Sequence, residues 1–238
     1  MKRLLATIRW DIQLQYRQGF YFVSAFVAVV LIILLKQLPP LDWAMVWPVI
    51  ILENLVVNAF YFNAGLVLLE KGEGTLEAMI VTPLRTREYL ISKVVSLGAL
   101  SLFETLLVVV AVTGAGFNWL LLVVGIMLLI AFYALYGFVV VARYDSISDF
   151  ILPSVAWTIW FSLPVLYFLG FWTHWLFFLH PLQAPLVLIK GAFERIPASH
   201  LLYGIGYSAL WVGIAYIFSQ RAFRQFIVTR QGLMRSPR

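Results

Sequence analysis

Two acidic side chains lie deep within apolar stretches of the sequence, where a carboxylate could bind or pass on a polar cargo. Glu53 and Glu104 are the only acids so placed. Because an ionisable group inside a membrane is costly, an intramembrane carboxylate is a candidate functional residue. Asn54, Asn58 and Tyr61 recur at helical spacing beside Glu53 and form a polar stripe. This pattern predicts either a substrate path or polar contacts between helices.

Both interpretations stay open for each acid. Glu53 could instead lie near the outer end of its helix, in contact with water, while the two asparagines join helices. Glu104 lies deeper in its apolar stretch. There, a protonated carboxyl group making a structural hydrogen bond is as good an interpretation as a transport role.

The chain offers little for catalysis or for metal binding. It contains no cysteine, which excludes thiolate catalysis, disulfides and Cys-ligated metal sites. The spacing of His174, His180 and His200 matches no zinc site, and we interpret them as interfacial residues. No H-E-x-x-H sequence, serine–histidine pair or aspartate pair lies within an apolar stretch. We therefore expect neither an enzyme nor a metal site.

The segment Leu68–Lys93 concentrates charge between two apolar stretches: Glu70, Lys71, Glu73, Glu77, Arg85, Arg87, Glu88 and Lys93. Gly72 and Gly74 predict the end of the preceding helix. Thr75 then predicts the N-cap of a short helix that runs to about Val81, with Glu77 complementing the helix dipole.

This short helix is predicted to carry an apolar side, formed by Leu76, Met79 and Ile80. Thr82-Pro83 is a second helix-start signal, leading into the next apolar stretch. A solvated loop does not need an apolar face, whereas an element that docks to a cytoplasmic partner does. The alternative is an ordinary capped loop with solvated charges.

The composition indicates that transmembrane helices position the acidic and charged residues described above. The chain is 63% hydrophobic and 12% charged, with a mean hydropathy of +0.93, whereas a soluble domain is roughly 45–50% apolar and 25% charged. Six stretches are long enough to span a bilayer, at about 20–38, 43–69, 89–112, 119–141, 150–171 and 201–218. We predict an all-α integral membrane protein with one transmembrane domain, residues 1–238. Pro48 and Pro164 should kink or locally unwind their helices.

The basic residues predict the orientation. With the N-terminus placed inside, 14 of the 17 Lys and Arg residues lie on the cytoplasmic side, and Lys36, Lys190 and Arg195 lie outside. This asymmetry satisfies the positive-inside rule and predicts that both termini are cytoplasmic. The net charge of +6 is thus explained by topology, and we expect no nucleic-acid partner.

Two further segments should lie at the membrane surfaces. Residues 1–18 have helical periodicity and predict an interfacial helix, with a continuous extension of the first span as the alternative. Residues 172–199 are apolar but are cut by Pro181, Pro185 and Pro197, which predicts re-entrant helices in the outer leaflet. Several tryptophans suit an interface or an aromatic-lined cavity: Trp157, Trp160, Trp172, Trp175 and Trp211.

The charged segment closely resembles the cytoplasmic loop of ABC-2 type transporter permeases. The matching residues are Glu70, Gly74, Thr75, Leu76, Glu77, Thr82, Pro83, Leu84 and Lys93. The resemblance implies that residues 70–88 form a coupling loop, whose helix sits in a groove of a separate ATP-hydrolysing subunit. The residues implied in that contact are Glu70, Glu73, Gly74, Thr75, Leu76, Glu77, Met79, Ile80, Thr82 and Pro83.

The same resemblance implies an assembly of two permease chains, identical or homologous, with two ATPase chains in the cell's inner (plasma) membrane. This chain has no G-x-x-x-x-G-K-[ST] phosphate loop, so ATP and Mg²⁺ are expected on the partner, with no cofactor here. Within the family, the chain is similar to drug and antibiotic export permeases of the fluoroquinolone type. That similarity implies export of an apolar or amphipathic molecule, drug-like or lipid-like. A permease for polysaccharides or lipid-linked glycans is the alternative, and a channel or an intramembrane enzyme are rivals of a different class.

Overall fold

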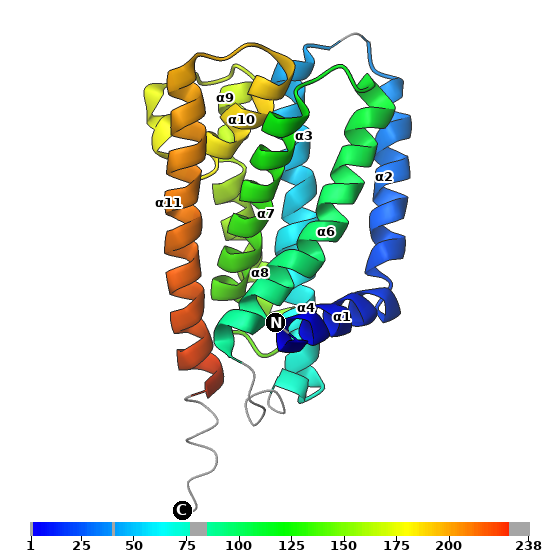
Figure 1. The fold of residues 1–238 in the computed structure, drawn as a ribbon, viewed down its shortest axis with the longest axis vertical. Coiled ribbons are helices and arrows are strands. Elements are labelled where there is room, and N and C mark those ends of the chain that lie inside the picture. The colour runs from blue at the N-terminus through cyan, green and yellow to red at the C-terminus, as the bar shows by residue number, and fades with distance from the viewer. Residues whose placement is uncertain (1, 40, 77–84, 229–238) are drawn as a thin grey trace, which may run out of the picture.

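The computed structural model describes residues 2–39, 41–76 and 85–228, and each regular element in these ranges is a helix (Figure 1). The first half contains α1 Lys2–Arg17, α2 Phe20–Lys36, α3 Trp43–Leu55, η1 Val56–Tyr61, α4 Phe62–Gly72 and α6 Thr86–Thr113. The second half contains α7 Trp119–Val141, α8 Ile147–Phe161, α9 Leu163–Phe168, η2 Trp175–Leu179, α10 Gln183–Phe193, α11 Ala198–Phe223 and η3 Arg224–Val228.

Five helical runs in these ranges are long and apolar enough to cross a membrane: Trp43–Gly72, Thr86–Thr113, Trp119–Val141, Ile147–Phe168 and Ala198–Phe226. They coincide with five of the six predicted spans. The remaining span, α2, has 17 residues, which gives a length of about 26 Å at 1.5 Å per residue, near the lower limit for crossing. Over the described ranges, the protein is therefore an all-helical membrane protein with five spanning runs, or six if the bent pair of α1 and α2 counts as one span.

The N-terminal helix α1 is separate from the first span. It meets α2 at an angle of 64°, and Gly19 between them has a φ of 76°, a conformation that glycine adopts readily. Figure 1 shows α1 lying across one end of the bundle, where α4 and α11 end and α6 begins. We call this end the basic end, because Arg17, Lys71, Arg85 and Arg221 lie at the ends of α1, α4, α6 and α11 there. The bend favours the interfacial helix over a continuous extension of the first span.

The second span contains a π-helical turn at a position where the sequence predicts no irregularity. Helix α3 continues through Pro48 without a break, whereas the π-helical turn η1 separates α3 from α4. Such turns widen a helix by one residue and often occur at functional sites. No break occurs at Pro48. A break does occur near Pro164, since α8 ends at Phe161 and Pro164 lies in the first turn of α9.

Between the last two spanning runs, the chain forms η2 and α10 at the end of the bundle opposite the basic end (Figure 1). Helix α10 has 11 residues, about 16 Å in length, and is too short to cross a bilayer. This length agrees with the prediction of broken helices and no further span in this segment, and their re-entrant place in the outer leaflet stays a prediction.

Glycines let α10 pack closely against its neighbours. A Cβ at Gly125 of α7 would lie 2.8 Å from Ile189 Cγ1 and 3.0 Å from the Pro185 carbonyl oxygen. A Cβ at Gly204 of α11 would lie 2.5 Å from Leu188 Cδ2. Helix α10 is therefore wedged between α7 and α11, and it holds the segment before it against the bundle.

Candidate functional site

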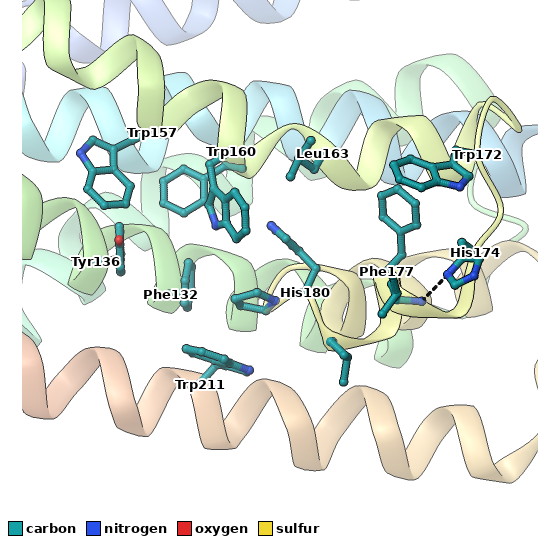
Figure 2. A pocket seen from close by; sticks show the side chains of 14 residues that line it. Phe132, Tyr136, Trp157, Trp160, Leu163, Trp172, His174, Phe177, His180 and Trp211 are labelled. Carbon is teal, nitrogen blue, oxygen red and sulfur yellow. Dashed lines mark hydrogen bonds between the residues drawn. The ribbon is translucent and has the colours of Figure 1, made fainter.

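A cavity of about 590 Å³ lies between α7, α8, α11 and the segment around η2. Eight of its fourteen lining side chains are Phe, Tyr or Trp, and none is acidic, amide-bearing, Lys or Arg. Figure 2 shows Trp157, Trp160 and Trp172 along one side, with Phe132 and Tyr136 of α7 and Trp211 of α11 facing them. We call it the aromatic cavity. Its size and lining are typical of pockets for drug-sized ligands.

The segment that closes this cavity is tied to α11 by tyrosine hydroxyls. Tyr203 donates to the Phe178 carbonyl oxygen and Tyr207 to that of Leu179, both at 2.7 Å. The backbone of η2 is thus fixed, and Phe177 points into the cavity (Figure 2).

Two of the six His and Trp side chains that line the aromatic cavity, those of His180 and Trp211, place a buried nitrogen there. His180 Nδ1 accepts the Leu182 N–H at 3.2 Å, so Nε2 carries the proton of the neutral imidazole. Burial lowers the pKa of His180 to about 4, which keeps the ring neutral at physiological pH, although the Trp160 backbone opposes the shift. Trp211 Nε1 is buried and has no hydrogen-bond partner among the described residues. A ligand with an acceptor atom would satisfy it.

Sequence analysis identified the tryptophans of this cavity but not the cavity's boundaries. Trp157, Trp160, Trp172 and Trp211 line it, whereas Trp175 does not. The phenylalanines of α7 and η2 carried no signal of their own, because apolar aromatics fill most of this chain. His174 and His180 also line the cavity. No group of three or more His, Cys, Asp or Glu residues in the described ranges could hold a metal ion.

The candidate acids inside the spans have different environments. Asn54 Nδ2 donates to Glu104 Oε1 at 3.1 Å, and Asn58 Nδ2 donates to Glu104 Oε2 at 3.0 Å. Asn58 also donates to Asn54 Oδ1. The three side chains are buried and form what we call the amide–carboxylate cluster. Glu53 is exposed and lies outside it.

Tyr61, the last member of the predicted stripe, contacts another span. Its hydroxyl lies 2.8 Å from Thr158 Oγ1 and accepts from Ser154 Oγ at 3.1 Å. The stripe of α3 and η1 thus joins two partners, since its asparagines contact α6 and its tyrosine contacts α8.

A buried ionic cluster lies at the basic end, and sequence analysis did not predict that its residues contact one another. Lys93 Nζ of α6 donates to Asp11 Oδ1 of α1 at 2.7 Å and also to Glu70 Oε1 of α4. Tyr89 and Ser92 each donate a hydroxyl at 2.7 Å, to Glu70 and Asp11 respectively. Asp11 and Glu70 are 0% exposed and Lys93 is 2% exposed. One lysine therefore joins α1 to α4 at the base of the charged loop.

Lys71, which follows Glu70 at the base of the loop, contacts the connection between α7 and α8. Lys71 Nζ donates to the carbonyl oxygens of Ala142 and Tyr144, at 2.6 and 2.7 Å, and lies 3.8 Å from Asp145 Oδ1. These residues connect α7 to α8. The base of the loop thus contacts both sides of the bundle, through Glu70 and through Lys71.

The coupling-loop residues that the structure describes differ from expectation in their orientation. Glu70 and Leu76 were expected to face a partner, but Glu70 is in the ionic cluster and Leu76 packs in the hydrophobic core. Thr75 was expected to cap a helix; Thr75 and Leu76 are helical, the Thr75 hydroxyl donates to the Glu70 carbonyl oxygen at 3.0 Å, and the rest of that helix lies outside the described residues. Gly74 has a φ of 68°, as a turn there requires, and Glu73 is exposed. The remaining predicted contacts lie outside the described residues: Glu77, Met79, Ile80, Thr82 and Pro83.

Comparison with known proteins gives the family. Residues 2–231 match the model of the fluoroquinolones export permease protein family. Two fluoroquinolones export permease proteins, from two strains of Mycobacterium tuberculosis, are each 30% identical to the chain over 239 residues. Each alignment covers 98% of this chain and 100% of the relative. No solved structure matches the chain. The chain belongs to the fluoroquinolones export permease protein family.

Proposed function

We propose that the chain is the membrane-spanning subunit of an ATP-driven exporter of apolar or amphipathic, drug-like molecules. The observation that carries this proposal is the aromatic cavity of about 590 Å³ in a member of an export permease family. Its stacked and edge-on rings suit a planar apolar cargo.

The cavity also favours one chemical class of cargo. Trp211 Nε1 is a buried donor without an acceptor in the part of the chain that the structure describes, so a carbonyl or carboxylate oxygen on the cargo would gain a hydrogen bond there. Fluoroquinolones are the first cargo to test, because the relatives carry that name. A glycan would need many polar partners, and the lining has no acidic or amide side chain. The alternative of glycan export is therefore less well supported.

Energy is proposed to come from a separate ABC ATPase, present in two copies, which binds ATP and Mg²⁺ and docks on the 70–88 loop. A second permease chain, identical or homologous, would complete the complex. In this arrangement the loop faces the cytoplasm of a cell bounded by its plasma membrane, and both termini are cytoplasmic. The distribution of basic residues along the sequence supports this orientation.

The contacts of Glu70 and Lys71 suggest how force on the loop would reach the cargo. Lys71 holds the carbonyl groups between α7 and α8, and both of these helices line the aromatic cavity. Glu70 holds α1 and α6 through Lys93. Displacement of the loop would thus move cavity-lining helices on one side and the interfacial helix on the other. Glu73, which is exposed, remains available to a partner.

Drug accumulation in cells tests this proposal. Cells that lack other drug pumps would express the chain with a candidate ATPase, and their fluoroquinolone content would be measured. Trp211→Ala should restore accumulation to nearly the level of cells without the permease, since it removes the donor and part of the cavity wall. Trp119→Ala is the matched control, because Trp119 is 45% exposed and does not line the cavity. Equal export by both variants would contradict a cargo role for the cavity.

A further inference from the structure

A second cavity, of about 480 Å³, lies between α2 and α6, away from the helices that line the aromatic cavity. Figure 1 shows α2 and α6 side by side along the bundle. Small side chains of α2, among them Ser24 and Ala28, leave this space, and Phe103 and Leu107 of α6 form apolar walls. Its volume is within the range of pockets for small ligands.

Glu104 is the single charged side chain among the described residues that line this cavity. It is 4% exposed and takes part in no ion pair within the described ranges. Because the cavity lining is mostly apolar and neutral amides cannot balance a negative charge, a bound cation would stabilise an ionised Glu104 more than any neutral ligand could.

The amide hydrogen bonds of Glu104 come from α3 and η1. Asn54 donates to Oε1 and Asn58 donates to Oε2, so both carboxylate oxygens act as acceptors. The two amides also fix the carboxylate from the side of α3 and η1. The remaining acceptor capacity of the carboxylate is available to a ligand in the cavity.

A second polar group in the cavity has no partner. Ser24 is 1% exposed, and its Oγ makes no hydrogen bond within the described structure. Buried hydroxyl groups are normally satisfied, so an unpartnered hydroxyl in the same cavity as a carboxylate without an ion pair in the described ranges indicates a polar ligand group between α2 and α6.

We propose that the α2–α6 cavity binds an organic cation, such as a protonated amine on an apolar body. Glu104 is its counterion, Ser24 Oγ is a second polar contact, and Phe103 and Leu107 pack against the body. The role of this cation as exported cargo rests on the proposed function, whereas its binding does not.

Equilibrium binding to the purified full-length chain in lipid nanodiscs tests the site. The probe is radiolabelled tetraphenylphosphonium, a permanent apolar cation, with uncharged triphenylphosphine oxide as competitor. The wild type should bind the cation, and the neutral compound should not displace it. Glu104→Gln should weaken binding at least about tenfold, because it removes the counterion and nearly preserves the shape. Glu53→Gln is the matched control, since Glu53 is exposed and lines neither cavity, and it should leave affinity unchanged.

Two results would overturn the proposal. One is wild-type affinity in Glu104→Gln, and the other is loss of binding in Trp211→Ala but not in Glu104→Gln, which would place the cation in the aromatic cavity. If Glu104→Gln does not fold, Ser24→Leu decides, because it narrows the cavity and leaves the carboxylate intact. Wild-type affinity in Ser24→Leu would then refute the site. Because no ATPase is present, a failure of the export proposal would not alter these results.

Discussion

Replacement of Lys93 by Met should destabilise the chain more than any other single loss of charge at the basic end. The substitution removes the shared cation of Asp11 and Glu70, whose side chains are both 0% exposed. Two carboxylates would then remain in one buried site, with hydroxyl donors from Tyr89 and Ser92 as their other side-chain partners within the described structure. Removing one member of a buried ion pair typically costs about 3–5 kcal/mol.

This cost should be visible as a lower unfolding temperature. For a chain of this size, 1 kcal/mol corresponds to roughly 2–4 °C, so a decrease of roughly 6–20 °C is expected. The assay is thermal unfolding in one fixed detergent, followed by intrinsic fluorescence of the nine tryptophans. Lys190→Met is the matched control, since its pair with Glu194 is 3.0 Å long but partly exposed. That loss should cost at most about 0.5 kcal/mol.

A compensated variant separates charge from packing. Combining Lys93→Met with Asp11→Asn and Glu70→Gln removes the unpaired charges, and most of the lost stability should return. Equal unfolding temperatures for Lys93→Met and Lys190→Met would refute the reasoning. The same holds if the triple variant is no more stable than Lys93→Met alone.

Two further predictions concern packing and orientation. Gly125→Ala should destabilise the chain by about 1–3 kcal/mol in the same unfolding assay, because its Cβ would meet Ile189 and the Pro185 carbonyl. Gly213→Ala, whose Cβ has no neighbour within 4 Å, should not lower stability, and equal effects would contradict the wedge. In sealed cells, an impermeant thiol reagent should label Phe171→Cys but not Glu73→Cys, because the proposed topology places residue 171 outside and residue 73 in the cytoplasm. The chain contains no cysteine of its own, so no other site would be labelled. The reverse pattern would contradict the proposed topology.

The long helices were predictable because a membrane span needs a long run of apolar residues, and such runs are visible in the hydropathy along the sequence. The short helices η2 and α10 were also predictable, since prolines cut their segment into pieces too short to cross a bilayer. The turn η1 was not predictable, because a π-helical turn depends on packing between helices and has no residue signature here.

Long-range pairing explains most of what sequence analysis missed. The stripe of Asn54 and Asn58 was visible as helical spacing, but spacing within one helix cannot identify Glu104 of another as the partner. Asp11 is one acid in the N-terminal segment of residues 1–18, and Lys93 is part of the family pattern. Their contact joins residues 82 positions apart, and local rules contain no information about it.

Glu70 shows that a sequence pattern does not reveal whether a carboxylate is exposed or buried. Its place beside two glycines suggested a loop open to solvent and to a partner. The structure instead places Glu70 within the helix before those glycines, where Lys93 and Tyr89 compensate for its burial. Sequence composition could not distinguish these cases, because an exposed and a paired carboxylate use the same residue.

Transport by purified components tests the central claim most directly. The chain and its candidate ATPase would be reconstituted in vesicles with the ATPase facing outward, and uptake of a fluorescent, planar, apolar drug would be followed. The account predicts uptake that requires ATP, Mg²⁺ and both subunits, and that Trp211→Ala reduces strongly while Trp119→Ala does not. Drug uptake that is unchanged when ATP or the ATPase is omitted would contradict it.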